Sequence, residues 1–277
     1  MAFFLGIDGG GTGCRAALAD DQGRILGQGA AGPANIATDP RGAERNILTA
    51  AQSALREAGL ASADKVSAVL GLAGANVSAS ARALTDRLPF ARIRVVSDAV
   101  TAATGALQGA DGIVAAMGTG SVFAVQRGGL MQQYGGRGFL LGDEGSGAAL
   151  GRTLLTEALR AEDGFASRSP LLSEVLRELG GVEGVIAFGL RARPADFAAF
   201  APRVIKPGDP AAERIFAAAV AEIGAMIDRL QHGAPLPVVF LGGVGPAYAA
   251  ALAGRWPIHP ALGSGLDGAL LLARQEV

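Results

Sequence analysis

The order of strands and glycine-rich turns occurs twice in this chain of 277 residues. Residues 3–29 read as a strand, a glycine-rich turn that carries a hydroxyl, a second strand, a short turn and a third strand, and residues 113–135 repeat that order. Two later apolar strands that run into glycine-bearing loops, 68–75 and 238–245, form a further matching pair. The repetition predicts a duplicated α/β unit, and duplicated halves are expected to leave a cleft between them.

A last matching pair consists of residues 93–107 and 258–270, each a strand or strand remnant followed by a helix that ends in Gly-Ala-Leu. Helical periodicity fills the intervals between the strands. Apolar residues recur at spacings of three and four from Ala43 to Ala58 after the start signal Asp39-Pro40. Residues 211–230, opened by Gly-Asp-Pro, predict the longest helix.

The turn-rich stretch 108–112 is the expected join between the halves. We therefore expect an N-terminal domain over 1–108 and a C-terminal domain over 109–264. A terminal helix within 265–277 is expected to pack back onto the first domain.

Composition restricts the class of partner. The formal net charge of −1 and the sequence pI of about 6.2 provide no basic field for nucleic acid or anionic membrane. The single cysteine, Cys14, excludes an internal disulfide and a cysteine-based metal site within one chain. No uncharged apolar stretch approaches the ~18 residues of a membrane span. These features predict a soluble cytoplasmic protein whose partners are small molecules.

The first glycine-rich turn has the chemistry of a phosphate site. Gly9, Gly10 and Gly11 leave a run of backbone without Cβ atoms, so N–H groups can close on an anion, while Asp8 can hold a hydrated Mg²⁺ and Thr12 can donate a hydroxyl hydrogen bond. A strand follows, so the segment is neither a Walker loop nor a Rossmann turn. The alternative is an ordinary hairpin turn, which needs fewer glycines.

The second turn, Gly118-Thr119-Gly120-Ser121, occupies the matching place in the second half. Two glycine-rich turns at equivalent positions could hold the phosphates of one nucleoside triphosphate from both sides of the cleft. Two structural hairpins are the alternative.

Four polar residues are candidates for substrate chemistry. Asp98 ends a strand and precedes a helix, where a kinase needs a general base, although a helix N-cap is the alternative. Asp143 and Glu144 stand in a glycine-rich loop before another helix, and they either bind sugar hydroxyls or cap that helix. Asn35 offers donors and acceptors to a polyol, or it is a turn asparagine.

These motifs, taken in order, resemble those of the actin, hexokinase and Hsp70-like phosphotransferases, in particular the BadF/BadG/BcrA/BcrD-type group that contains the glucosamine and N-acetylglucosamine kinases. The resemblance extends over nearly the whole chain and implies two ribonuclease H-like, actin-like ATPase domains of the α/β class with an interdomain cleft. It also implies ATP-dependent transfer of the γ-phosphoryl group to the 6-hydroxyl of glucosamine. The matching segments are Gly6 to Ala16, Ala34-Asn35-Ile36, 72–75, 97–99, 118–121, 135–137, 143–147, 208–210 and 268–270.

The resemblance assigns roles to individual positions. Asp98 is the implied general base, and Asp8 is the implied Mg²⁺-associated acid. The implied ATP-binding residues are Asp8, Gly10, Gly11, Thr12, Arg15, Gly118, Thr119, Gly120, Ser121, Gly242 and Gly243. The implied sugar-binding residues are Asn35, Asp98, Gly120, Asp143 and Glu144.

Several alternatives stay open at this point. Relatives that take N-acetylglucosamine can carry Asn where Val122 stands, so the acceptor is glucosamine, N-acetylglucosamine or another hexose. Related activator ATPases use cysteine-bound iron–sulfur clusters, which a chain with only Cys14 does not support. A nucleotide-dependent sugar sensor or clamp is a rival class, disfavoured because we expect no DNA-binding segment before Phe3 and no substrate-binding domain after Leu266. The oligomeric state is open, with a homodimer as one alternative.

Overall fold

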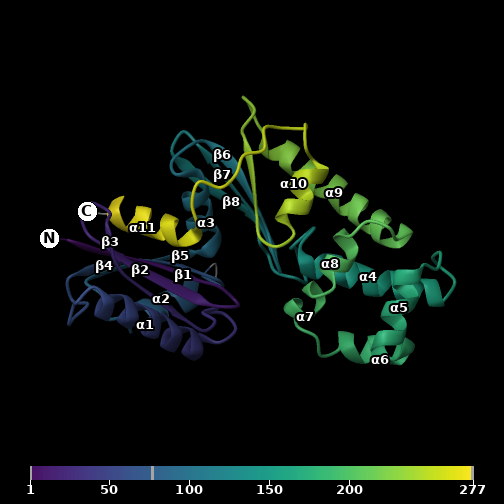
Figure 1. Cartoon of the computed structure of the whole chain (residues 1–277), viewed down its shortest axis with the longest axis horizontal. Coiled ribbons are helices and arrows are strands. Elements are labelled where there is room, and N and C mark those ends of the chain that lie inside the picture. The colour runs from purple at the N-terminus through teal and green to yellow at the C-terminus, as the bar shows by residue number, and fades with distance from the viewer. Residues whose placement is uncertain (1, 76–77, 276–277) are drawn as a thin grey trace. The chain divides into compact units, whose positions relative to one another are not determined.

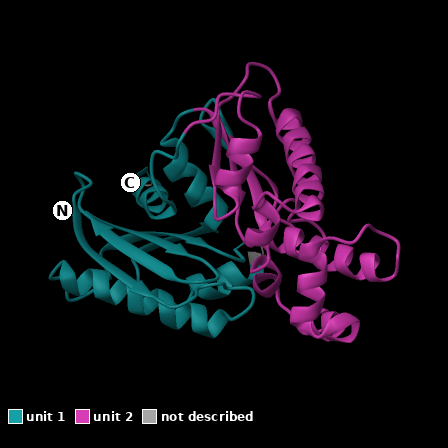
Figure 2. Ribbon diagram, turned by 45° about the vertical axis from the view of Figure 1, so that its right-hand side comes forward, with its two compact units in different colours: residues 1–110, 126–131, 260–277 teal, residues 111–125, 132–259 magenta. Residues whose placement is uncertain are grey.

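The computed structural model describes residues 2–75 and 78–275, and the chain divides into two compact units (Figure 2). The first unit holds the described residues up to 110, together with 126–131 and those from 260 onward; the second holds 111–125 and 132–259. Each unit contains one β-sheet (Figure 1). Residues 276–277 of the expected terminal helix lie outside the described residues.

The strands lie in two groups along the chain. They are β1 (Phe3–Gly9), β2 (Cys14–Ala19), β3 (Ile25–Ala31), β4 (Val66–Leu72), β5 (Arg92–Ser97), β6 (Gly112–Met117), β7 (Ser121–Arg127), β8 (Leu130–Gly135) and β9 (Val238–Leu241).

The helices connect and cover these strands. They are α1 (Pro40–Glu57), α2 (Ser78–Thr85), α3 (Asp98–Leu107), α4 (Gly147–Glu162), α5 (Pro170–Leu179), α6 (Gly181–Gly189), α7 (Pro194–Ala198), α8 (Ala201–Ile205), α9 (Pro210–Leu230), α10 (Gly245–Ala251) and α11 (Gly265–Gln275).

The first sheet has the strand order β3-β2-β1-β4-β5. The first three strands form an antiparallel meander, and β4 and β5 continue the sheet in parallel with β1. Helix α1 packs on β2 and β3, whereas α11 and α3 lie on the opposite face (Figure 1). Burial of apolar side chains on both faces explains why β1 and β4 are nearly continuous apolar runs.

The second sheet repeats this order as β8-β7-β6-β9, with β9 parallel to β6. Next to β9, Ile258 forms one isolated parallel bridge with Val238, in the place that β5 occupies in the first sheet. The predicted duplication of strand order and the predicted strand remnant are both confirmed. The expected helix end at Gly-Ala-Leu is correct for α3 but wrong for α11, which continues to Gln275.

Helix α1 begins where the sequence predicted. The Asp39 side chain accepts a hydrogen bond from the Gly42 N–H, and Pro40 occupies the first turn, where its missing N–H costs nothing. Ile47 and Leu55 are among the residues that this helix buries. The longest predicted helix is likewise present as α9, capped by Asp209.

The backbones of helices α3 and α11 approach each other closely at two glycines. A Cβ added at Gly105 would overlap the Ser264 carbonyl oxygen, and one added at Gly268 would overlap the Thr101 carbonyl oxygen. The two glycines therefore allow a close approach that any larger residue would prevent. Because Asp98 is the first residue of α3, this contact helps to fix its position.

Cys14 is buried at the start of β2, opposite Gly9. Burial, with a contribution from the negative charge of Asp8, raises the pKa of its thiol to about 12. In the part of the chain that the structure describes, no helix is both long and apolar enough to span a membrane.

Candidate active site

Two candidate carboxylates of the first unit lie at one edge of its sheet. Asp8 is near the end of β1, and Asp98 directly follows β5. In register, Gly9 pairs with Leu72 and Leu72 with Ser97, so the carboxyl ends of these parallel strands coincide. The topology thus brings together two acids that are ninety residues apart in sequence.

Asp98 is not the cap of α3. Ser97 is the N-cap, and its side chain accepts a hydrogen bond from the Val100 N–H, whereas the Asp98 carboxylate accepts one from the Ala99 N–H at 2.9 Å. The capping alternative for Asp98 is therefore wrong. Burial raises the pKa of the Asp98 carboxyl; the Ala99 hydrogen bond opposes this shift, and the negative charge of Asp8 adds to it.

Asp8 has a cationic neighbour. Its carboxylate accepts a hydrogen bond from Arg15 Nη2 at 2.8 Å, and its side chain keeps 21% of its surface exposed. A Cβ added at Gly265, the first residue of α11, would lie 3.1 Å from Asp8 Oδ1. The carboxylate is accordingly held between β2 and the start of α11 without being sealed from solvent.

The first glycine-rich turn is closed by a hydrogen bond from the Gly10 N–H to the Gly13 carbonyl oxygen at 2.9 Å. Gly11 and Thr12 are exposed at its tip. Among the described residues other than Gly11 and its chain neighbours, none has an atom within 4 Å of a Cβ added at Gly11, so open space adjoins the turn there. This exposed backbone is compatible with the predicted phosphate contact.

The Asn35 segment is tied to the same turn, because the Ala34 N–H donates to the Gly10 carbonyl oxygen at 2.8 Å. The Asn35 side-chain oxygen accepts hydrogen bonds from the Ala37 and Thr38 N–H groups. Asn35 is therefore a turn asparagine, as the alternative interpretation held. Its role toward sugar stays a prediction.

In the second unit, neither Asp143 nor Glu144 caps the helix that follows. Ser146 is the N-cap of α4, and its side chain accepts a hydrogen bond from the Ala149 N–H at 3.1 Å. The capping alternative is again wrong.

The buried Asp143 carboxylate accepts hydrogen bonds from the backbone N–H groups of Ser121 and Gly138. Burial raises the pKa of this carboxyl; the two hydrogen bonds oppose the shift, and the charge of Glu144 adds to it.

The second glycine-rich turn lies directly against this acidic segment. Ser121 Oγ donates to the Glu144 carbonyl oxygen at 2.7 Å, and the Gly147 N–H donates to the Gly118 carbonyl oxygen at 2.8 Å. A Cβ added at Gly120 would lie 2.8 Å from Asp143 Oδ2, so a larger residue there would displace the Asp143 carboxylate. The structure thus brings the predicted second phosphate turn and the predicted sugar carboxylate into contact.

The glycine loop after β9 reaches the same turn. The Val244 N–H donates to the Met117 carbonyl oxygen at 3.0 Å, and Gly242 has a φ of +82°, which favours glycine. Gly243 and Val244 line a pocket of about 260 Å³ together with Gly118 and Thr119. A loop predicted to bind adenosine and a turn predicted to bind phosphate therefore share one pocket within one unit.

Sequence reasoning missed the apolar wall of this pocket. It comes from α7 and α8 and consists of Ala198, Ala201, Pro202 and Ile205. Small apolar residues in two five-residue helices leave no sequence signal that distinguishes them from ordinary core. A larger pocket of about 480 Å³ beside α1 contains none of the predicted site residues.

The chain belongs to the BadF/BadG/BcrA/BcrD ATPase family, whose family model matches residues 5–256. It is 31% identical to the glucosamine kinase GspK of Vibrio cholerae over 283 aligned positions, which cover 99% of this chain and 96% of that protein. A solved structure from Chromobacterium violaceum, provisionally assigned as an N-acetylglucosamine kinase, is 32% identical with a TM-score of 0.88 and 99% coverage of both chains.

A ROK family glucokinase from Streptomyces griseus, solved with glucose and AMPPNP, has the same fold, with 22% identity, a TM-score of 0.57 and coverage of 99% of this chain and 100% of that one. The predicted family and the predicted α/β fold with two actin-like sheets are confirmed.

Proposed function

We propose that the protein is an ATP-dependent kinase that phosphorylates the 6-hydroxyl of glucosamine to give glucosamine 6-phosphate and ADP. The observation that carries the proposal is the full-length similarity to the Vibrio cholerae glucosamine kinase. Membership of an ATPase family supports ATP as the donor. N-acetylglucosamine is a second candidate acceptor, favoured by the similarity to the Chromobacterium violaceum structure.

The pocket of the second unit suits the nucleotide. The backbone N–H groups of Gly118, Thr119 and Gly243 would face the phosphates. Successive backbone N–H groups in a turn form a concave site for an anion. Ala201 and Ile205 would contact the apolar faces of the nucleoside.

Asp8 fits a Mg²⁺ ion that arrives with ATP. Among the described residues there is no group of three or more His, Cys, Asp or Glu side chains that could hold a metal alone. Mg²⁺ commonly keeps several waters and binds one or two carboxylates plus substrate phosphates, so one accessible carboxylate is sufficient. When bound, the ion would offset negative charge on the phosphates. Arg15 beside Asp8 supplies a second positive group.

The proposed reaction requires a base at the acceptor hydroxyl. Asp98 accepts the proton of the sugar 6-hydroxyl while the hydroxyl oxygen forms a bond to the γ-phosphorus of ATP. The bond between the γ-phosphorus and its bridging oxygen breaks, and ADP leaves. Its raised pKa suits proton acceptance near neutral pH better than that of an ordinary surface carboxylate. Asp143 and Glu144 would hold other groups of the sugar, including the ammonium of glucosamine.

The test is a direct assay. Purified protein with Mg-ATP is given glucosamine, N-acetylglucosamine, glucose or mannose in turn, with ADP release as the readout and mass spectrometry to identify the phosphorylated product. We expect sugar-dependent ADP formation, highest with glucosamine. ADP release that no sugar raises above background would overturn the proposal.

A further inference from the structure

Tyr248 lies on α10, the helix that begins directly after the Gly242–Val244 loop. Its side chain is completely buried, and its hydroxyl donates a hydrogen bond to the carbonyl oxygen of Gly145 at 2.7 Å. Gly145 stands between Glu144 and the α4 cap Ser146. One buried hydrogen bond therefore joins the helix behind the nucleotide loop to the segment that carries the sugar carboxylates.

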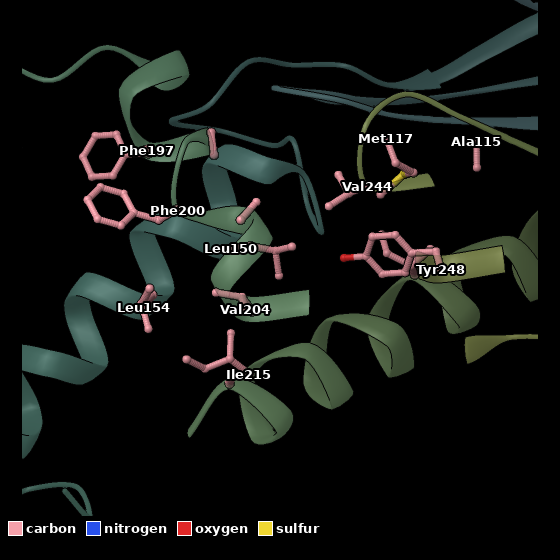
Figure 3. Close-up of a cluster of buried hydrophobic side chains, with 14 of the residues drawn as sticks. Ala115, Met117, Leu150, Leu154, Phe197, Phe200, Val204, Ile215, Val244 and Tyr248 are labelled. Atoms are coloured by element: carbon pink, nitrogen blue, oxygen red, sulfur yellow. The ribbon is translucent and has the colours of Figure 1, made fainter. Parts of the chain in front are cut away.

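The tyrosine ring is held by packing on the second unit's core. Its centroid lies 5.3 Å from that of Phe216, and Met117 and Val244 belong to the same buried cluster (Figure 3). Burial raises the pKa of the hydroxyl, and the charge of Glu222 adds to the shift. The hydroxyl therefore keeps its proton and remains a hydrogen-bond donor.

The 143–146 turn needs such support. Asp143 has a φ of +59°, which is unfavourable for a residue with a side chain, and Gly145 has a φ of +65°. Unfavourable backbone conformations persist only where surrounding contacts determine them. Ser121 provides contacts to Asp143 and Glu144, and Tyr248 holds the next residue along.

We propose that Tyr248 is a positioning residue for sugar binding: its hydrogen bond to Gly145 keeps the turn in the conformation that orients the Asp143 carboxylate. The identity of the ligand rests on the proposed function, whereas the effect on the turn does not. Tyr248 touches neither substrate and acts only through the turn.

The test is Tyr248→Phe, which keeps the ring and removes the donor, leaving a buried carbonyl oxygen without its partner. We expect the KM for glucosamine to rise about five- to tenfold, the range for one lost hydrogen bond of this kind. The KM for ATP should stay within about twofold, because the contacts of the nucleotide pocket are unchanged. Hydrogen exchange of the Ser146 amide, which donates to the Asp143 carbonyl oxygen within the turn, should accelerate while amides in β6 stay protected.

Two controls separate positioning from general stability. Tyr134→Phe makes the same chemical change at the other tyrosine of the chain, and Phe216→Leu weakens packing on Tyr248 without removing its hydroxyl. Both should leave the KM for glucosamine near that of wild type, even where the melting temperature falls.

An unchanged KM for glucosamine in Tyr248→Phe, with only a lower melting temperature, would overturn the inference. So would unchanged exchange at Ser146, which can be measured without any activity. A wild-type protein that phosphorylates no sugar would refute the proposed function, and the exchange experiment would still decide whether Tyr248 holds the turn.

Discussion

At the scale of single residues, the most informative observation is that serines are the N-caps of α3 and α4. The sequence alone had left aspartate as an alternative N-cap for both helices. The side chains of Ser97 and Ser146 each accept a hydrogen bond from one N–H of the first turn, of α3 and α4 respectively, so neither Asp98 nor Asp143 is needed as the N-cap. Both carboxyls have raised pKa values because burial disfavours their charged forms. Raised carboxyl pKa values of this kind cluster at functional sites.

Asp98→Asn tests the general base. We expect the rate of sugar phosphorylation to fall by roughly 10²-fold or more, because asparagine cannot accept the hydroxyl proton. The melting temperature at pH 7 should equal or exceed that of wild type, because the variant removes a carboxylate whose ionised form burial disfavours.

Ser97→Ala is the matched control, since it removes the true cap and should cost about 1 kcal/mol of stability. If the Asp98→Asn variant phosphorylates sugar at a rate within a few fold of wild type, the general base must be another carboxylate.

The pH profile follows from the same carboxyl. Asp98 accepts a proton only when ionised, so kcat/KM should fall as the pH drops through its raised pKa. Since the charge of Asp8 contributes to that shift, Asp8→Asn should move the acidic limb of the residual activity to lower pH. Rate profiles of both proteins over a range of pH would check this. An acidic limb that does not move would mean that another group controls it.

The candidate site could be predicted from sequence where chemistry depends on residue type and order. Asp98 and the two glycine turns stand at matching ends of duplicated strands, and that pattern is visible without a structure. The apolar wall from Ala201 and Ile205 was not predictable, because its placement depends on tertiary packing of short helices. For Asn35 the sequence could not decide between two roles, because an asparagine that forms turn hydrogen bonds and one that binds a ligand look the same in sequence.

At the scale of elements, the contact between α3 and α11 tolerates no added side chain at its glycines. Gly268→Ala would place a methyl group onto the Thr101 carbonyl oxygen, so we expect a loss of about 1–3 kcal/mol, the usual cost of overpacking. Denaturant unfolding would measure it.

Gly189→Ala in α6 is the control, because among the described residues beyond its own helical turn none lies within 4 Å of the added Cβ, and alanine favours helix. Equal stability of the two variants would contradict the backbone contact.

The element pattern was predictable for a physical reason. Strand periodicity, turn residues and caps are local, and in this chain they agree with the tertiary structure, as at Asp39 and Pro40. The terminal helix was expected within 265–277, and α11 occupies Gly265–Gln275, where its buried Ala273 packs with Phe4 and Val69 of the first sheet.

At the scale of the whole molecule, the property to be determined is the preference between glucosamine and N-acetylglucosamine as acceptor. Under the proposed function, the Val122 side chain on β7 would offer no hydrogen bond to an acetamide, whereas the Asp143 and Glu144 carboxylates would attract an ammonium. We expect a higher kcat/KM for glucosamine than for N-acetylglucosamine, and Val122→Asn should change that ratio about tenfold toward the acetylated sugar, the value of one hydrogen bond. Steady-state kinetics with both sugars would measure it. A reversed wild-type ratio would refute the ranking and leave kinase activity intact.

The reactivity of the buried Cys14 can report local opening of the first sheet. A thiol reacts as the thiolate, and a pKa of about 12 leaves almost none of it at neutral pH in the folded state. Modification by a thiol reagent therefore requires β2 to open beside the first glycine turn, and with a single thiol in the chain the signal has one source. The labelling rate of the unaltered protein, compared with and without nucleotide, reports how often that edge of the sheet opens.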